Sequence, residues 1–562
     1  MSPSFRDQLW IVAIASCIFF VRLGATTFWD EDETLYAEIV REMIDRQDWT
    51  VPLYNGRLVT DKPPMVYWLM ISGIRVFGES EFAARVGFAA LAVATSLLTY
   101  QIGAKIYNRR AGIWAAVAVA SNVIFDVSAR ACTPDSPLVF FTVAALWLYV
   151  RAGGLEGGKL AWSTAAAMYG CMGLGMVTKG PVAFVLPVGL LMLYHLGRAP
   201  SAIWWKRFSP QAVWHVGWSL RPITAIVVIG AVASPWFAAV GLRTDGQWLS
   251  SFFLEHNAKR FLQPNMGHAG PVFYHPLVVM IGFFPWSVFL PQALVHLVRR
   301  IRSGDASSKA DLFVACWAAA YIVFFSFSKT KLPNYVLPAY PALALVIGSF
   351  VDRWLARPSE VHRAWFRWAL GSSSAVGGAV VIALGVAGVW LLDGDWGIGL
   401  FGLVPFFGGL VAWQLHRQES NRACLAVFGA SAVLFVVLGF GIAGPAVNRY
   451  HTAPQMMTHW RASTGGSMPL AAYRDLDPSL VYYARRDVAL LHEPSDVRAF
   501  LADVSNGCLL IRSDKYAAIA AELPDDVRVL ERRPRFLKKG EFLLLGRPTT
   551  SVASASAPSA VR

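Results

Sequence analysis

Long apolar runs separated by short polar loops make up most of this chain. A helix that spans a membrane needs about 20 mostly apolar residues, and about thirteen runs approach that length. They lie near residues 8–23, 83–106, 111–127, 136–150, 161–178, 181–197, 222–241, 275–296, 311–328, 335–351, 369–392, 397–415 and 423–444. The pattern predicts a polytopic α-helical membrane protein with about thirteen transmembrane helices.

Two segments between these runs are long, and both are predicted to lie on the outer face. The first, residues 24–82, contains an amphipathic stretch at 34–46 and an apolar stretch at 65–77. Both are too short or too polar to span, so we expect two helices that lie along the membrane surface. The second, residues 242–274, is interrupted by Gly and Pro, which predicts a flexible loop over a site.

The pattern changes after residue 444. Short apolar runs near 469–472, 488–491, 508–512, 527–530 and 541–545 alternate with helix-like stretches at 494–504 and 514–522. This alternation predicts a small α/β domain over residues 445–548, after a transmembrane domain over residues 1–444. The Ser/Ala-rich tail, residues 549–562, is predicted to be disordered.

Composition and charge place the chain in a membrane. It has 562 residues, of which 55% are hydrophobic and 15% charged, and its formal net charge is +14. The basic residues gather in short loops rather than in tracts with interleaved aromatics, which argues against nucleic-acid binding and agrees with the positive-inside rule. That rule predicts a multi-pass protein of the bacterial inner membrane, with its C-terminal domain in the periplasm. The six cysteines lie mostly in apolar runs without a CxxC pair, so we expect packing residues.

Four consecutive acids, Asp30 to Glu33, follow the first apolar run, and Asp61 and Lys62 come one loop later. Carboxylates at a membrane boundary are costly, so they usually have a function or a cationic partner. A solvated helix N-terminus is the alternative. We predict that Asp32 and Glu33 are the working pair, with Asp32 favoured, and that Lys62 holds a phosphate from a backbone fixed by Pro63-Pro64.

Further charged residues interrupt the apolar pattern on the predicted outer face. Asp135 and Arg130 lie at membrane depth, where ionisable groups suggest function, although a helix N-cap beside a pairing arginine is the simpler alternative. Basic residues occur in outer loops where the positive-inside rule disfavours them, which suggests an anionic ligand. The predicted phosphate-binding set is Lys62, Arg85, Arg130, Lys179, Lys329 and Lys331.

Metal binding has only weak support. Asp61, His256 and His268 are candidate ligands on the outer face, but no paired-His spacing accompanies them, and they are as well explained as ordinary loop residues. The sequence requires no cofactor and leaves a divalent metal open. A Gly-rich phosphate loop beside a βα unit is also missing from the sequence, so we expect a lipid-linked donor instead of a nucleotide sugar.

Several motifs resemble bacterial aminoarabinose transferases, lipid A-modifying members of the protein O-mannosyltransferase-like superfamily with the GT-C fold. They are Phe28-Trp29-Asp30-Glu31-Asp32-Glu33-Thr34-Leu35-Tyr36-Ala37-Glu38-Ile39, Trp49-Thr50-Val51-Pro52, Lys62-Pro63-Pro64, Thr133-Pro134-Asp135, Thr178-Lys179-Gly180-Pro181 and Lys331-Leu332-Pro333-Asn334-Tyr335. The tandem Asp-Glu departs from the single pair expected, and the spacing to Tyr36 favours Asp32. The catalytic set is then Asp32, Glu33, Lys62 and Asp135, with Tyr36, Asp61 and Tyr335 added to the substrate-binding residues.

The resemblance implies transfer of 4-amino-4-deoxy-L-arabinose from undecaprenyl phosphate to lipid A phosphates at the periplasmic face. The enzyme would be an inverting glycosyltransferase whose product gives resistance to polymyxin. Two alternatives stay open at this point. One is a polyprenyl-phosphate-sugar transferase with another acceptor, such as a protein O-mannosyltransferase. The other is a transporter of lipid-linked sugar, since ions within membranes also mark transport paths.

Overall fold

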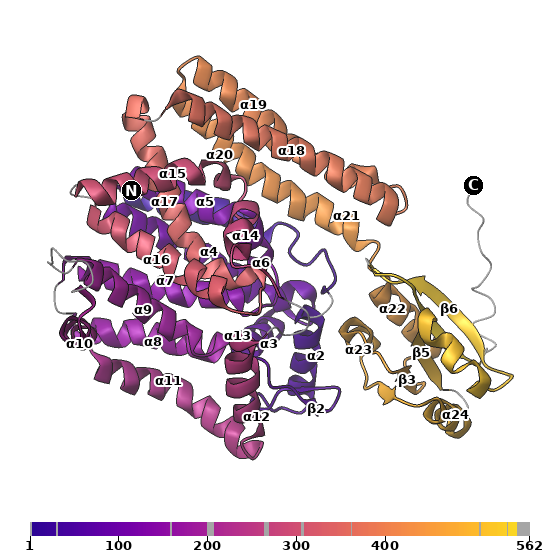
Figure 1. The fold of residues 1–562 in the computed structure, drawn as a ribbon. Coiled ribbons are helices and arrows are strands. Elements are labelled where there is room, and N and C mark those ends of the chain that lie inside the picture. The colour runs from indigo at the N-terminus through magenta and orange to yellow at the C-terminus, as the bar shows by residue number, and fades with distance from the viewer. Residues whose placement is uncertain are drawn as a thin grey trace.

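The computed structural model describes residues 3–547, except 30–31, 158–159, 199–206, 264–268, 305–307, 361, 505–506 and 537. A large helical region is followed by a small region with a β-sheet (Figure 1). The predicted tail and residues Asp30, Glu31 and His268 lie outside the described residues.

Each of the thirteen apolar runs contains a helix or a bent pair of helices. The helices within these runs are α1 (Pro3–Phe20), α4 (Glu81–Ile106), α5 (Arg109–Ala120), α6 (Val123–Ala129), α7 (Asp135–Arg151), α8 (Trp162–Lys179), α9 (Val182–Arg198), α11 (Pro222–Arg243), α14 (Tyr274–Gly282), α15 (Leu290–Ser303), α16 (Ser308–Phe327), α17 (Tyr340–Ala356), α18 (Arg363–Leu391), α19 (Leu403–Arg417) and α20 (Asn421–Leu438). Shorter elements join them, namely η1 (Gly154–Glu156), α10 (Pro210–Ser219), η4 (Trp286–Phe289), η5 (Pro333–Ala339), η6 (Pro358–Glu360), η7 (Trp396–Gly402), η8 (Gly439–Ala443) and α21 (Gly444–Asn448).

Among the described residues, seven helices are long and apolar enough to cross a membrane, or up to nine if each of two bent pairs is one span. The bent pairs are α5 with α6, at 68°, and α14 with the segment Trp286–Ser303, at 116°. The chain is therefore a multi-pass membrane protein. Helices α1 and α8 have 18 residues and α7 and α9 have 17, near the lower limit for a span. The count of thirteen spans stays a prediction.

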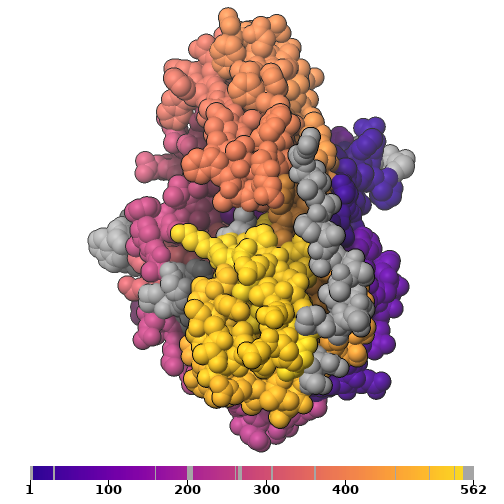
Figure 2. Space-filling model, turned by 90° about the vertical axis from the view of Figure 1, so that its right-hand side faces the viewer, coloured from indigo at the N-terminus to yellow at the C-terminus, as the bar shows by residue number. Residues whose placement is uncertain are grey.

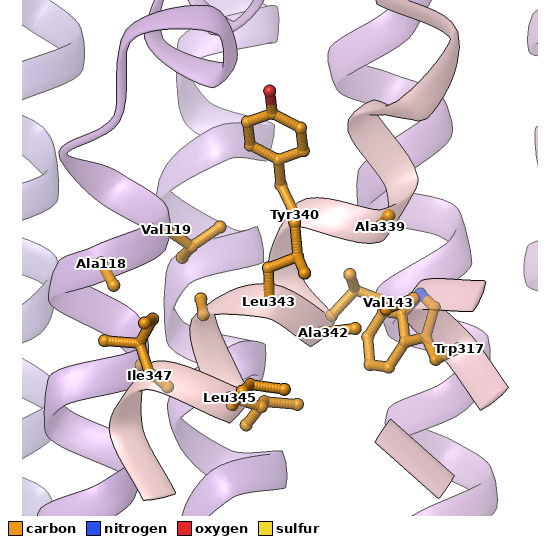
Figure 3. Close-up of a cluster of buried hydrophobic side chains, with 14 of the residues drawn as sticks. Ala118, Val119, Val143, Trp317, Ala339, Tyr340, Ala342, Leu343, Leu345 and Ile347 are labelled. Atoms are coloured by element: carbon orange, nitrogen blue, oxygen red, sulfur yellow. The ribbon is translucent and has the colours of Figure 1, made fainter. Parts of the chain in front are cut away.

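Helix α17 forms the centre of the largest apolar core. Its side chains are almost all buried, and Leu343, Leu345 and Ile347 lie among residues of α5, α7 and α16 (Figure 3). Small residues allow the close approach, since a Cβ at Gly348 would meet the carbonyl oxygen of Ala111 at 2.2 Å. Close backbone contact is a common way to pack helices in a membrane.

The first long outer segment folds as two helices and a hairpin. Helices α2 (Asp32–Asp45) and α3 (Met65–Phe77) match the two predicted interfacial helices. Between them, β1 (Leu53–Tyr54) and β2 (Arg57–Leu58) pair antiparallel. Asn55 and Gly56 both have positive φ, as the tight turn of such a hairpin requires. These elements lie at the opposite end of the helical region from α10, on the side that faces the C-terminal region (Figure 1).

The predicted flexible loop 242–274 is largely helical in the structure. It contains α12 (Gln247–Ser250), the π-helix η3 (Ser251–Lys259) and α13 (Arg260–Leu262). The Trp248 indole of the segment donates a hydrogen bond to the Val59 carbonyl at 3.0 Å, and Ser251 shares a hydrogen bond with the Thr60 hydroxyl at 2.8 Å. These contacts attach the segment to the loop that carries Asp61 and Lys62.

The five predicted strands are all present after residue 469. Strands β3 (Leu470–Tyr473), β4 (Ala489–Leu491), β5 (Cys508–Arg512), β6 (Arg528–Pro534) and β7 (Glu541–Gly546) form one sheet in the order β4-β3-β5-β7-β6. Strand β3 is parallel to β4 and β5, and β7 is antiparallel to β5 and β6. The helices of this region are α22 (Thr452–Thr464), α23 (Pro478–Ala484), α24 (Pro494–Asp503), η9 (Ser513–Ala518) and η10 (Ala520–Glu522). In Figure 2 the C-terminal region, in yellow, faces the viewer, and it lies below the orange helices α18 and α19.

Candidate functional site

Asp32 and Lys62 meet around the hydroxyl of Tyr36. Asp32 is the first residue of α2, so Tyr36 lies one turn later on the same face. The Tyr36 hydroxyl is 3.4 Å from both Asp32 Oδ1 and Asp61 Oδ2. The Lys62 ammonium donates to Asp61 Oδ2 at 3.0 Å. The helix start and the loop before α3 thus present one lysine and two carboxylates together.

A second charged group comes from α7, α8 and η5. Lys179, the last residue of α8, forms an ion pair with Asp135, the first residue of α7. The Asn334 amide donates to the other oxygen of Asp135 at 2.8 Å. The Lys179 ammonium also lies 5.4 Å from the centre of the Tyr335 ring. Both oxygens of Asp135 are therefore held by side chains from other elements.

The two groups act on each other electrostatically at Asp32. Its side chain is exposed to solvent, yet the surrounding protein removes part of its hydration. Loss of hydration in these surroundings raises the pKa of Asp32 above its ordinary value. Lys62 and Lys179 oppose this increase, and Asp61 and Asp135 add to it. The site therefore combines two ammonium groups, of Lys62 and Lys179, with three carboxylates, of Asp32, Asp61 and Asp135.

Two buried polar atoms beside this group make no hydrogen bond within the described part of the chain. They are Oδ1 of Asp61 and the hydroxyl of Tyr67, and the Tyr67 ring packs edge-on against Tyr36 at 5.8 Å. Buried polar atoms are almost always paired, so unpaired ones require an explanation. A polar ligand bound between them would supply the partners.

Glu33 and Arg85 have a different arrangement from the one we predicted. They form a buried ion pair, with Arg85 Nη2 2.7 Å from Glu33 Oε2. Glu33 also accepts hydrogen bonds from the backbone N–H groups of Trp29 and Cys132, at 3.1 and 2.9 Å. Arg85 donates further bonds to the carbonyls of Leu23, Thr26 and Thr27. Their hydrogen-bonding groups are occupied by the protein itself, so the geometry favours a structural role over catalysis for Glu33 and over phosphate binding for Arg85.

Arg130 is also engaged by the backbone rather than directed at the site. Its guanidinium donates to the carbonyls of Ile18, Phe19 and Val21 at 2.7 to 2.9 Å, and its cation lies 5.0 Å from the Phe440 ring. Carbonyls at the end of a helix lack partners within the helix, and α1 ends at Phe20. Arg130 therefore caps α1, which does not favour the phosphate-binding role predicted for it.

The two lysines of the 328–332 loop differ from each other. The Lys331 side chain is 4% exposed, and its ammonium donates to the carbonyls of Phe325 at 3.2 Å and Ser326 at 2.5 Å. Burial, with a contribution from Lys329, lowers the pKa of Lys331. Lys329 is exposed and available to a ligand. The geometry thus retains Lys329 as a candidate for phosphate binding and gives Lys331 a helix-capping role.

The candidate metal ligands do not form a cluster among the residues that the structure describes. Asp61 belongs to the charged site, and His256 Nε2 lies 3.3 Å from the Thr60 hydroxyl. One group of three acids, Glu38, Glu42 and Asp487, has ligand atoms within 4.8 Å of one another, but Glu38 binds Arg41 and Glu42 accepts from the Asn55 backbone. The metal requirement stays open.

Two site residues were not in the predicted set. Asn334 binds Asp135, and the Tyr67 hydroxyl faces the site without a partner. The sequence carries a signal for both. Tyr67 follows the Lys62-Pro63-Pro64 motif by three residues, and Asn334 lies within the Lys331–Tyr335 motif.

Comparison with known proteins relates the chain to membrane glycosyltransferases. The family model "Dolichyl-phosphate-mannose-protein mannosyltransferase" matches residues 61–227. A protein named undecaprenyl phosphate-alpha-4-amino-4-deoxy-L-arabinose arabinosyl transferase, from Edwardsiella ictaluri, is 26% identical over 94% of this chain and 96% of its own. A protein of the same name from Photorhabdus laumondii is 29% identical, over 86% of this chain and 85% of its own.

The fold gives the same relationship. The crystal structure of ArnT from Cupriavidus metallidurans bound to undecaprenyl phosphate matches with a TM-score of 0.80 and 22% identity, over 97% of this chain and 98% of that one. The similarity in sequence and the shared fold cover the helical region and the C-terminal sheet together. By sequence, this chain is similar to aminoarabinose transferases over most of its length, and it shares the GT-C fold of ArnT.

Proposed function

We propose that this protein transfers 4-amino-4-deoxy-L-arabinose from undecaprenyl phosphate to phosphate groups of lipid A. The observation that carries the proposal is the charged group in which Lys62, Asp61, Tyr36 and Asp32 act electrostatically with Asp135 and Lys179. Relatives named for this activity align over most of the chain, and a related structure holds undecaprenyl phosphate. We assign the site to the periplasmic face of the inner membrane, because the basic loops lie on the other side.

The charges suit departure of a phosphate from the anomeric carbon. The bond from C1 of the sugar to the undecaprenyl phosphate oxygen breaks, and a bond from C1 to an oxygen of the lipid A phosphate forms on the opposite face. Such reactions pass through a transition state in which the sugar carries positive charge. Lys62 stabilises the negative charge that builds on the leaving phosphate, and Lys179 contributes from α8.

The acidic residues orient the reactants. A lipid A phosphate monoester has a second pKa of about 6, so it is already an anion and needs little help from a base. Asp32 instead faces the sugar, where a carboxylate binds the ammonium group of an amino sugar and stabilises positive charge in the ring. Asp135, held by Lys179 and Asn334, adds negative charge beside it and orients Lys179. Asp32 then acts by position and charge more than by proton transfer.

Lipid A chemistry tests the function directly. Mass spectrometry of lipid A from cells with and without this protein is expected to show the added mass of one pentosamine only when the protein is present. Purified protein with labelled donor is then given lipid A in one reaction and an acceptor peptide in another. Transfer to the peptide alone would indicate a protein glycosyltransferase. Absence of any transfer in detergent, where no gradient exists, would favour transport.

Replacement of Asp32 by Asn tests its role through the pH dependence of the reaction. Because burial raises the pKa of Asp32, the carboxylate is protonated at a higher pH than an ordinary aspartate. We expect kcat of the unchanged protein to fall on the acidic side at a pH above the ordinary aspartate range. In Asp32→Asn, transfer should fall by about 100-fold, and the acidic limb that belongs to Asp32 should disappear.

Asp45→Asn is the matched control, since Asp45 lies at the other end of α2 in an exposed ion pair with Arg41. It should leave rate and pH profile unchanged. Near-normal transfer by Asp32→Asn, measured in the purified system and as survival in polymyxin, would exclude the proposed role of Asp32.

A further inference from the structure

The C-terminal region contacts the backbone just before the catalytic helix. The Tyr483 hydroxyl, from α23, accepts a hydrogen bond from the Phe28 N–H at 2.9 Å. The same hydroxyl donates to Glu81 Oε1 at 3.0 Å. Phe28 precedes Asp32 by four residues, and Glu81 begins α4, which also carries Arg85. One side chain of the C-terminal region therefore joins the two segments between which the charged site is built.

Other contacts surround this pair of bonds. The Phe28 ring packs edge-on against Tyr482 at 5.3 Å, and the Trp29 ring packs against Phe536 at 5.8 Å. In the β1–β2 turn, the Asn55 side chain both donates to the Val488 carbonyl, at 2.8 Å, and accepts from the Val488 N–H, at 3.0 Å. Helices α2 and α23 lie side by side (Figure 1). The contact is therefore an interface with specific polar pairs.

The membrane region holds the same backbone from its other side. Glu33 accepts from the Trp29 N–H at 3.1 Å, and Arg85 donates to the carbonyls of Thr26 and Thr27 at 2.8 and 3.1 Å. The N–H of Thr27 donates to Asn448 Oδ1 at 3.1 Å. Residues 26–29 are thus held from two sides, and within the described residues the sheet-bearing region after α21 bonds to their backbone through Tyr483.

We infer that Tyr483 is a positioning residue for the transfer reaction, and that the C-terminal domain is part of the catalytic unit because it holds the segment leading to Asp32. The inference rests on the proposed function and assigns a role to a region far from Asp32 in sequence. Catalytic groups must be held to within fractions of an ångström, and misplacement by 1 Å costs about 100-fold in rate. In the described part of the chain, Tyr483 bonds to the Phe28 N–H and to Glu81 and makes no hydrogen bond to Asp32, Asp61 or Lys62, so its effect on them passes through the backbone.

The test is Tyr483→Phe in the full-length protein, which removes the hydroxyl and keeps the ring. We expect kcat, normalised to protein in the folded monomer peak, to fall by about 10-fold or more, with the KM for the donor within about twofold. Hydrogen exchange, read by mass spectrometry, should become faster at Phe28 and Trp29. Normalisation to folded protein separates this result from a simple loss of stability.

Tyr473→Phe is the matched control. Tyr473 lies in β3 of the same sheet, and its buried hydroxyl has no hydrogen-bond partner among the described residues. Its loss should change neither kcat nor exchange at residues 26–29. Equal kcat values in Tyr483→Phe and Tyr473→Phe, or an increase in KM that accounts for the whole effect, would overturn the inference.

Failure of the inference about Tyr483 can be distinguished from failure of the proposed transfer reaction. If the unchanged protein transfers no sugar to lipid A, the proposed function is contradicted, and the exchange measurement then decides the structural part alone. Unchanged exchange at Phe28 and Trp29 in Tyr483→Phe would overturn the inference in that case as well.

Discussion

Lys62→Ala is expected to reduce transfer by about 100- to 1,000-fold. Lys62 is the lysine nearest to the Asp61–Tyr36–Asp32 group, and its ammonium is held 3.0 Å from Asp61. When the prenyl phosphate leaves, negative charge grows beside the partly buried Lys62 and Asp61, where the dielectric is lower than in water and an unpaired charge is costly. The measurement is kcat with a purified undecaprenyl-phosphate donor and lipid A, together with growth of complemented cells in polymyxin.

Two further variants test whether the effect of Lys62→Ala is specific to this position and whether it depends on the positive charge. Lys309→Ala removes an exposed lysine that pairs with Glu156 at 3.1 Å, on the side of the basic loops, and should leave transfer unchanged. Lys62→Arg retains the charge and should keep a larger part of the activity than Lys62→Ala, although its planar head group does not reproduce a compact ammonium. Normal turnover by Lys62→Ala would remove Lys62 from the mechanism.

Glu33→Gln is expected to lower the stability of the folded protein by about 3–5 kcal/mol. Although burial alone raises the pKa of Glu33, Arg85 and two backbone N–H donors hold it below the ordinary value. The neutral amide leaves the buried Arg85 cation without a counter-charge and offers one acceptor oxygen in place of two. Thermal unfolding in detergent, followed by size-exclusion chromatography, should show an earlier transition.

The control for this change is a surface pair. Glu79→Gln breaks the ion pair between Glu79 and Arg485, which are both well exposed, and should cost no more than about 1 kcal/mol. The double change Glu33→Gln with Arg85→Met removes both buried charges and should recover part of the loss. A melting transition of Glu33→Gln that matches that of Glu79→Gln would contradict the structural role assigned to Glu33.

The pattern of apolar residues was sufficient to locate the secondary structure. Each apolar run contains a helix, and each of the five short runs after residue 468 contains a strand. This works because the bilayer requires long apolar helices with internal backbone hydrogen bonds, and because buried strands read as short apolar runs. The segment 242–274 was harder to read, because its described residues include short helices that its Gly and Pro content did not predict, while its flexibility stays a prediction.

The sequence by itself therefore determined the class of the protein and the residues from which a site could be built, including Asp32, Lys62, Asp135 and Lys179. Only the tertiary structure decided which charges face that site and which support the fold. Arg85 and Arg130 look like phosphate ligands in sequence, yet one pairs with Glu33 and the other caps α1. The reason is that a buried guanidinium requires hydrogen-bond acceptors. For Arg85 and Arg130 these are a carboxylate and backbone carbonyls from distant parts of the chain, up to 112 residues away in sequence, and only the folded structure shows which ones they are.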